Sequence, residues 1–300
     1  MFMNPNRLLL ACTLLVGLLT QACQDHMLSP AQTGAPALRL RVKALTEDLP
    51  NNATKITTFS YDSQGRLSSL LAYQTPDSAQ ANIERSTYQY DGQNRLIRQQ
   101  RQLIVRPNTL FFTGPVTDGH TFTYNATNRI AEIRYLASFY AFTPGVLSYD
   151  PSVLNSPNAL NQLATLQYSP TGQLVGSTKV SYFQGSPGLV TTNQTYSYTN
   201  QDLTSSNAIQ LQTGTPVSNT TYALSYDSQT NPFYGSYVIG RYFGGIGEGF
   251  QNLNTLSPHN ITSLGGVTYR YEYNSSGLPT VRYTNTDKLI QTLRFTYESY

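Results

Sequence analysis

The sequence predicts an all-β protein, made of tandem antiparallel β-hairpins that form a large curled sheet or a barrel-like meander of roughly 14–18 strands. Two observations predict this fold. An aromatic residue or Leu, then any residue, then Tyr, then four turn-forming residues recur along the chain. Helical periodicity is absent after the N-terminal apolar stretch, whereas hairpin signals continue to the last residues.

The composition fits a folded β protein and excludes some function classes. The 23 Tyr and 12 Phe supply material for a core, while charged residues make up only 12% of the chain, about half of the usual share. The 19 basic and 16 acidic residues give a net charge of +3. This charge is small and dispersed, so we expect no nucleic-acid partner.

Residues 1–22 have the pattern of a secretory signal peptide. Arg7 precedes an apolar stretch from Leu8 to Leu19, which is shorter than the roughly twenty residues of a membrane span. The sequence Thr-Gln-Ala-Cys that follows resembles the end of a bacterial lipoprotein signal, although a Thr stands where Leu is usual. The resemblance implies cleavage after Ala22 and a lipid on Cys23. The alternative is an uncleaved N-terminal anchor in which Cys23 has no role.

Residues 23–37 are predicted to be the lipidated N-terminus and a flexible tether, because Pro, Gly, Ser and Ala occur there without periodicity. Cleavage would remove Cys12 and lipidation would use Cys23, so the mature chain would have no free thiol. We expect the lipid to bind the membrane and to make this chain a lipoprotein of the outer membrane or the cell surface. Residues 38–300 are then a single β domain.

The β domain repeats one motif that ends in tyrosine. Residues two apart lie on the same face of a strand, so each aromatic-x-Tyr pair projects in one direction. The tyrosines that anchor the repeats are Tyr61, Tyr90, Tyr124, Tyr168, Tyr198, Tyr226, Tyr273 and Tyr297. Tyr297 closes the chain without a turn, and each of the other copies is predicted to be one hairpin.

The four residues after each tyrosine suit a type I turn followed by a bulge. Asp, Asn, Ser or Thr at the first position can accept a hydrogen bond from the backbone two residues on, and Pro170 has the φ that the second position needs. Gly or Asn at the fourth position permits the left-handed conformation that rejoins the strands. The predicted turn positions are Asp62, Gly65, Asp91, Asn94, Asn125, Asn128, Pro170, Gly172, Asn274 and Gly277.

These motifs resemble those of YD-repeat proteins, which include large Rhs-type shells. The best copies run from Tyr61 to Leu67 and from Tyr90 to Leu96, the copy from Asn125 to Ile130 is fair, and the others are degenerate. The chain is too short for a shell and is more similar to small YD-repeat lipoproteins of Bacteroidota, for which a porin-like β fold has been proposed. Residues 226–233 and 257–262 are similar to a recurrent passage of that family. The family has no established activity, so the resemblance implies a cellular location and a fold but no reaction.

The longer connections are expected at the end of the sheet opposite the short turns. They cover residues 75–85, 106–119, 137–161, 184–194 and 233–265. One interpretation is a recognition surface on a rigid sheet, which would bind a glycan or a protein. The other is that these segments are neutral insertions.

The strands fit either a protein in water or a porin-like wall. A porin-like wall would carry Leu and Val at mid-bilayer and aromatic residues at the interfaces. Here Tyr runs through the strands, and Arg98 and Arg101 are expected on opposite faces of one strand. We therefore expect a membrane-tethered sheet or barrel that stands in water, and a membrane-spanning porin-like barrel is the weaker alternative.

The sequence predicts no catalytic, cofactor or metal site. Asp118-Gly119-His120 could place a carboxylate near an imidazole, but such loop tripeptides are common. Glu84, Glu132, Glu248, Glu272 and Glu298 are scattered, so carboxylate-pair chemistry is neither supported nor excluded. We expect no enzyme, and a surface hydrolase is the weakest alternative.

The expected function is that of a lipid-anchored scaffold, adhesion or interaction module. A binding lipoprotein that captures a glycan or peptide for nutrient uptake is the alternative. The repeat tyrosines, here called the tyrosine ladder, are compatible with either function, because exposed tyrosines could stack on a sugar or on a partner protein. The other interpretation of the ladder is that these tyrosines form the core of a chain that has no Trp.

Overall fold

A computed structural model describes residues 40–49, 52–77, 83–104, 115–137, 160–183, 186–236, 253–286 and 289–300. Residues 1–22, Cys23 and the tether to residue 37 lie outside this described part, so the signal peptide and the lipid site stay predictions. In the described part of the chain, no helix is long and apolar enough to cross a membrane.

Sixteen β-strands make up the fold. They are β1 (Leu40–Asp48), β2 (Thr54–Tyr61), β3 (Leu67–Thr75), β4 (Ile83–Tyr90), β5 (Leu96–Ile104), β6 (Pro115–Tyr124), β7 (Ile130–Ala137), β8 (Leu160–Tyr168), β9 (Leu174–Phe183), β10 (Ser186–Thr199), β11 (Asp202–Gln212), β12 (Thr215–Thr230), β13 (His259–Leu264), β14 (Val267–Tyr273), β15 (Pro279–Thr286) and β16 (Leu289–Ser299). A single short 3₁₀ turn, η5 (Leu253–Thr255), precedes β13 in the described part.

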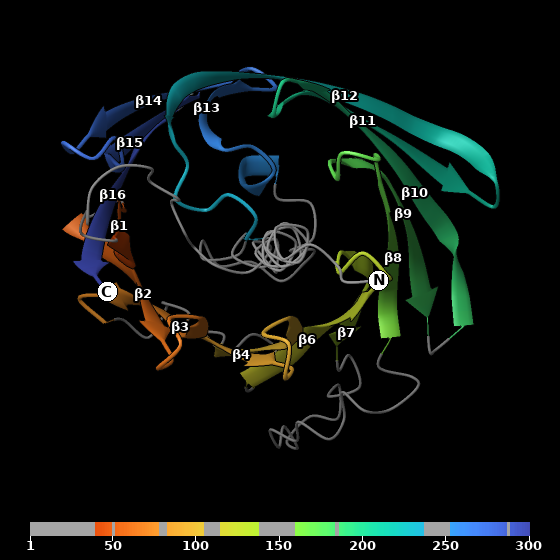
Figure 1. The fold of residues 1–300 in the computed structure, drawn as a ribbon, viewed down its shortest axis with the longest axis horizontal. Helices are drawn as coiled ribbons and strands as arrows, with labels where there is room; N and C mark the ends of the chain where they lie inside the picture. Colours follow the sequence, from red (N-terminus) through yellow and green to blue (C-terminus); the bar gives the residue numbers. More distant parts are fainter. Residues whose placement is uncertain are drawn as a thin grey trace, which may run out of the picture.

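The strands form a closed antiparallel barrel (Figure 1). Each strand pairs with its neighbours along the chain, and β1 pairs with β16 to close the ring. The all-β meander predicted from the repeats is confirmed, with a strand number inside the expected range. Of the two predicted shapes, a curled sheet and a barrel, the structure has the barrel.

The short turns predicted after Tyr61, Tyr90, Tyr124, Tyr168 and Tyr273 all lie at one end of the barrel, here called the turn end. At each of them the register shifts by a bulge at the tyrosine. The opposite end is called the far end. Because the strands alternate in direction, successive hairpin connections alternate between the two ends.

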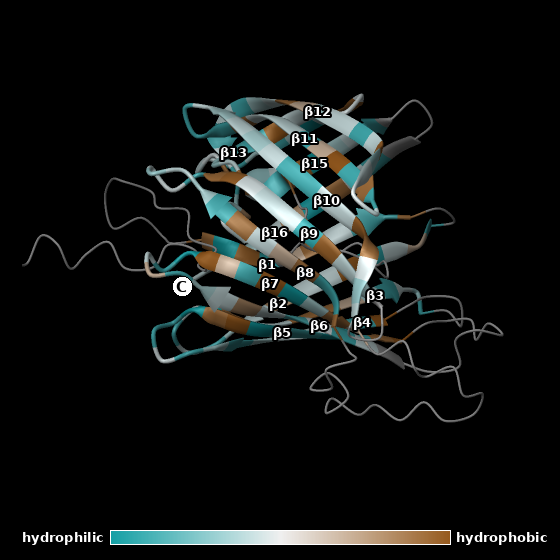
Figure 2. Cartoon of the chain, turned by 90° about the vertical axis from the view of Figure 1, so that its right-hand side faces the viewer, coloured by the Kyte–Doolittle hydropathy of each residue, from teal (hydrophilic) through white to brown (hydrophobic). Residues whose placement is uncertain are grey.

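Near the turn end, the inward side chains form an apolar layer across the barrel. Apolar and polar residues alternate along the strands (Figure 2). Because successive side chains of a strand point to opposite faces, one face of each strand supplies this layer and the other faces outward. The layer comprises Val42, Leu45, Phe59, Leu67, Leu70, Tyr88, Leu96, Phe122, Ile130, Ile133, Leu166, Leu174, Tyr196, Leu203, Leu224, Phe233, Leu253, Ile261, Leu293 and Phe295, all of them buried.

The connection after β12 does not lie where the sequence predicted it. Residues 233–265 were expected at the far end, but β12 ends at the turn end, and the chain passes from there into the barrel (Figure 1). Phe233 and Leu253 of this connection are part of the apolar layer. The prediction was wrong because Asp227–Thr230 does not turn. These residues continue β12, so the Tyr226 copy has no hairpin turn of its own.

Two other predicted connections were too long. Residues 186–194 belong to β10, and residues 115–119 belong to β6. The Asp118-Gly119-His120 tripeptide is therefore strand rather than loop, and Asp118 and His120 point inward from it.

Candidate functional site

The repeat tyrosines lie at the rim of the apolar layer and are not exposed platforms. Tyr61, Tyr90, Tyr124, Tyr168, Tyr198, Tyr226 and Tyr297 are partly buried against the layer. Four hydroxyls donate hydrogen bonds to backbone carbonyls of a neighbouring strand: Tyr61 to Val42 at 2.6 Å, Tyr90 to Leu67 at 2.9 Å, Tyr124 to Leu96 at 2.8 Å and Tyr297 to Pro279 at 2.7 Å. For these seven tyrosines the core interpretation of the ladder is confirmed.

The first and fourth turn positions after Tyr61, Tyr90, Tyr124, Tyr168 and Tyr273 have the geometry that the sequence suggested. The amide of Gly65 donates to the Asp62 carbonyl at 2.9 Å, as in a type I turn, and the Gln64 amide donates to Asp62 Oδ1 at 2.9 Å. Gly65, Asn94, Asn128, Gly172 and Gly277 have φ values of 82°, 64°, 60°, 91° and 72°. This left-handed region is open to Gly and tolerated by Asn.

Sequence reasoning missed the arginine that follows three of these turns. Arg66 approaches Asp62 Oδ2 through two nitrogens at 2.7 Å, donates to Asn94 Oδ1 of the next hairpin at 2.8 Å, and lies 4.5 Å from the ring centre of Tyr90. Arg95 repeats this arrangement with Asp91, Asn128 and Tyr124. Arg129 bonds the Gly172 carbonyl and lies over Tyr168. The sequence did contain a signal for this arrangement, because an Arg directly follows the four turn residues in each of these three copies.

These arginines affect the turn carboxylates. Burial acts to raise the pKa of Asp62, but hydrogen bonds from the Arg66 backbone and side chain and from the Gln64 amide bring that pKa below its usual value. The same balance lowers the pKa of Asp91, with Arg95 as partner. The turn end is thus a row of ion pairs and stacked rings that link one hairpin to the next.

The later copies depart from this pattern. Tyr198 precedes a shorter turn at Asn200, whose φ is 58°, and Leu203 follows it in the apolar layer. Tyr273 donates a hydrogen bond to Asp227 Oδ2 and stacks on Tyr271 at 5.9 Å. Asp227 therefore binds a tyrosine of another strand where the sequence predicted it to begin a turn.

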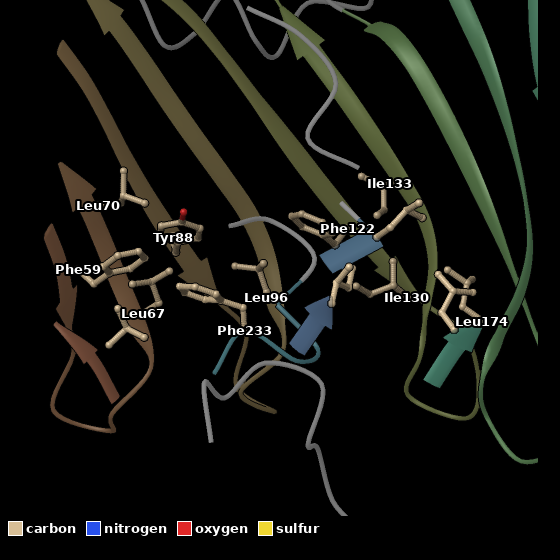
Figure 3. Close-up of a cluster of buried hydrophobic side chains, with 14 of the residues drawn as sticks. Phe59, Leu67, Leu70, Tyr88, Leu96, Phe122, Ile130, Ile133, Leu174 and Phe233 are labelled. Atoms are coloured by element: carbon tan, nitrogen blue, oxygen red, sulfur yellow. The ribbon is translucent and has the colours of Figure 1, made fainter. Parts of the chain in front are cut away.

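Phe233 is the centre of the apolar layer. Its ring centre lies 6.1 Å from that of Phe59 on β2 and 6.2 Å from that of Phe295 on β16. Figure 3 shows the Phe233 ring near Phe59, Leu67 and Leu96, whose side chains point inward from the wall.

Asn231 holds the chain in position for this contact. Its side-chain amide donates to the carbonyls of Asn254 at 2.6 Å and Ser257 at 2.9 Å. Its Oδ1 atom accepts from the Phe233 amide at 3.0 Å. The connection therefore has its own hydrogen-bond scaffold and fills the turn end of the barrel with apolar side chains.

Between the apolar layer and the far end, β4 to β7 carry a buried charge cluster, defined as Glu84, Arg101, Asp118, His120 and Tyr135. Arg101 and Asp118 are register partners on β5 and β6. Arg101 Nε donates to Asp118 Oδ1 at 2.8 Å, and Nη2 donates to Oδ2. Tyr135 donates to the same carboxylate at 2.9 Å, and Glu84 lies 4.0 Å from the guanidinium.

Arg101 is only 1% exposed, so its charge depends on this pairing. Burial acts to lower the pKa of Arg101, but the hydrogen bond and the charge of Asp118 raise it above its usual value. His120 Nδ1 lies 2.9 Å from Gln99 Oε1, its register partner, and the ring lies 5.1 Å from that of Tyr135. Asp118 is thus engaged by Arg101 and Tyr135, and the arrangement is that of a buried ion pair supported by hydrogen bonds.

A carboxylate–imidazole contact that the sequence did not suggest lies at the turn end. His259 Nδ1 is 2.8 Å from Asp202 Oδ2. The nearby Ser257 is fully buried, and its Oγ atom accepts a hydrogen bond from the Leu203 amide at 2.8 Å. Burial raises the pKa of the neighbouring Tyr226 to about 12. The serine therefore anchors the inserted connection to β11.

The outward face of the barrel is mostly polar near the turn end, with half-buried apolar side chains such as Leu71, Leu163 and Val180 toward the far end. Charged pairs lie on it within or between strands: Arg134 with Glu132 at 3.5 Å, Arg270 with Glu272 at 3.9 Å and Arg294 with Asp48 at 2.6 Å. Exposed Thr, Gln, Asn and Ser residues occupy other outward positions, among them Thr87, Gln89, Thr123, Thr165, Gln167, Asn193, Thr195 and Ser197. The predicted placement of Arg98 and Arg101 on opposite faces is confirmed, since Arg101 faces inward and Arg98 alternates with it.

The scattered glutamates do not gather in one place. Glu84 is inside, Glu132 and Glu272 are on the outer face, and Glu298 pairs with Arg41 at 2.8 Å at the turn end. Glu248 lies outside the described residues. Within the described ranges, no group of three His, Cys, Asp or Glu residues could hold a metal ion.

No protein-family model matches the chain, and no curated protein matches it. The resemblance to YD-repeat proteins is thus not supported. The barrel is similar to a solved porin-like protein of Bacteroides uniformis, with a TM-score of 0.48 and 15% identity over 85% of this chain and 96% of that chain. It is also similar to a porin-like protein of Bacteroides vulgatus, with a TM-score of 0.36 and 9% identity over 86% of this chain and 98% of that chain.

Proposed function

We propose that this chain is a lipid-anchored, non-catalytic interaction module of the cell envelope, whose barrel stands in water and does not conduct. The observation that carries this proposal is the distribution of polarity across the wall. Toward the far end, some half-buried apolar side chains lie outward, among them Leu71, Leu163 and Val180. Near the turn end, however, the outward face carries charged pairs and hydroxyl or amide side chains, and the apolar side chains of the layer point inward. A lipid-facing wall requires the opposite, because an Arg at the bilayer midplane costs about 2–4 kcal/mol.

The apolar layer supports the same proposal. Phe233 and Leu253 fill the turn end from inside, and buried side chains surround them from β1 to β13 and from β16. Such a dehydrated layer opposes the passage of ions and polar solutes. We therefore interpret the similarity to porin-like proteins as a similarity of the barrel fold alone. The predicted lipid on Cys23 then attaches the protein to the membrane.

The test compares the full chain with the chain that starts at Gln24, which contains all sixteen strands. We expect the full chain to carry a lipid and to fractionate with membranes, and Cys23→Ala to lose the label and the membrane association. We expect the chain from Gln24 to stay in the aqueous phase of a Triton X-114 partition and to give no conductance in planar bilayers. Insertion with stepwise conductance would overturn the proposal in favour of a membrane-spanning barrel.

A second candidate function is the capture of a glycan inside the far half of the barrel. Neutral hydrogen-bonding side chains line the inside there, among them Gln99, Ser177, Gln194 and Ser206. Amides, hydroxyls and aromatic rings are the groups that recognise sugars in proteins. A glycan array on the soluble barrel tests this, and binding that Gln194→Leu removes would favour it over a purely structural role.

A further inference from the structure

The hairpin of β11 and β12 extends beyond the barrel (Figure 1). β12 begins at Thr215, but its pairing with β13 begins only at Leu224. Over residues 215–223 all nine side chains are exposed, on both faces of the strand. A strand that is part of a barrel wall would have one buried face, so this segment projects into solvent.

The projecting part of β12 has an open edge. In the part of the chain that the structure describes, residues 215–223 pair with β11 on one side only. The opposite side presents backbone N–H and C=O groups in an extended row. Such a row is a template for a further strand, and natural proteins commonly protect it with charges, Pro or bulges.

This edge lacks the usual electrostatic protection. No charged residue occurs from Leu203 to Tyr226, although charged pairs occur on the outward face elsewhere. Pro216 is next to the hairpin tip, and the strand after it is free of Pro. Apolar side chains lie exposed on this projection and on β10 beside it: Val217 is 54% exposed and Tyr222 39%, and Leu189 on β10 is 64% exposed.

We propose that the occupant of this edge is a second copy of the chain, paired antiparallel through residues 217–223 about a two-fold axis. Two identical edges without charge do not repel each other, and an antiparallel pair of identical strands satisfies both edges with one set of contacts. The pairing joins β10, β11 and β12 of both copies into one continuous sheet and covers Val217 and Tyr222. It rests on the proposed function in one respect, that the outer wall faces water.

The first experiment measures the mass of the chain from Gln24 by sedimentation and light scattering over a range of concentrations. We expect a reversible dimer. In this pairing residue 220 lies opposite its own copy and residue 217 lies opposite residue 223. In the double substitution, Thr220→Lys therefore places two like charges directly opposite each other, and Val217→Lys replaces an apolar contact with a charge. We expect it to weaken the dimer by about tenfold or more. The matched control is Thr195→Lys on β10, which is also exposed but pairs with Gly176 on one side and Asn207 on the other.

A wild-type chain that stays monomeric at all concentrations overturns the proposal, and so does a dimer that Thr195→Lys weakens and the double substitution leaves intact. Unchanged circular dichroism and thermal unfolding establish that the variants are folded. Amide hydrogen exchange is the second measurement, and we expect protection of residues 217–223 to rise with concentration. These outcomes are separate from conductance in bilayers, which tests the proposed function.

Discussion

The Tyr90 hydroxyl donates a hydrogen bond to the Leu67 carbonyl, 2.9 Å away, and so fastens the second hairpin to the first. The ring of the same tyrosine carries the guanidinium of Arg66, 4.5 Å from its centre. One side chain therefore joins two hairpins through its hydroxyl and through its face. This explains why tyrosine, and not phenylalanine, ends the motif.

Tyr90→Phe removes the hydroxyl and leaves the ring in place. We expect a loss of about 1 kcal/mol in the free energy of unfolding, because the Leu67 carbonyl loses its partner at a half-buried site. Urea unfolding measures it. Tyr73→Phe is the control, since Tyr73 also lies half-buried on a strand and is not one of the motif tyrosines. Equal effects of the two substitutions would contradict the linking role of Tyr90.

Asp91→Asn tests the ion pair at the second turn. Because the folded-state pKa of Asp91 is lowered, its charge stabilises the fold above the unfolded pKa of about 3.9, and the effect is lost as the pH falls through the folded-state pKa. We expect the variant to be less stable by about 0.5 kcal/mol at pH 7. The difference should vanish near pH 2 in unfolding curves measured at both pH values.

Asn125 supplies the matched control, because it holds the third turn without a titratable group. Its Oδ1 atom accepts from the Thr127 amide at 2.9 Å and from the Arg129 amide at 3.0 Å. Asn125→Ala should cost about 1 kcal/mol at both pH values. A pH-dependent loss at this position would show that the pH effect at Asp91 is not due to its own charge.

Phe233→Ala removes the centre of the apolar layer. We expect a loss of about 3–5 kcal/mol, because a buried aromatic ring leaves a cavity that the rigid wall cannot close. Chemical unfolding and binding of an apolar dye measure it. Tyr234→Ala removes the adjacent, exposed ring and should cost far less. A small loss from Phe233→Ala would mean that the inserted connection is not part of the folded core.

Arg101→Met breaks the buried ion pair and leaves Asp118 charged inside the barrel. We expect a loss of about 3–5 kcal/mol, measured by chemical unfolding. On the outer face, Arg134→Met removes a comparable pair with Glu132 in contact with water, where the loss should stay below about 1 kcal/mol. The double variant with Asp118→Leu should recover much of the loss. If it does not, the cluster has a role beyond mutual charge compensation.

Much of the turn end could be predicted from the sequence because its signals are local. Asp or Asn at the first turn position and Gly or Asn at the fourth determine the hairpins within five residues. The same rule for the fourth turn position could have shown that no turn forms after Tyr226. The fourth position there is Thr230, whose β-branched side chain disfavours a positive φ, and the strand continues instead.

Closure and the buried charge cluster could not be predicted, because both depend on residues far apart in the chain. The pairing of β1 with β16 joins Val42 to Tyr297, and nothing near either residue specifies the partner. Arg101 and Asp118 meet because the β5–β6 register aligns them, and the sequence did not specify where β6 begins. A register error of one residue in either strand would turn that strand's charged side chain to the outer face and separate the pair.

The order of the strands has a consequence for how the chain folds. Every pairing except that of β1 with β16 joins neighbours along the sequence, so hairpins can form one after another as the chain becomes available. The entropic cost of bringing distant ends together falls on a single event, the docking of β16 on β1. Until that event, both terminal strands have an unpaired edge, so an intermediate that lacks β16 is the species most exposed to misassembly between chains.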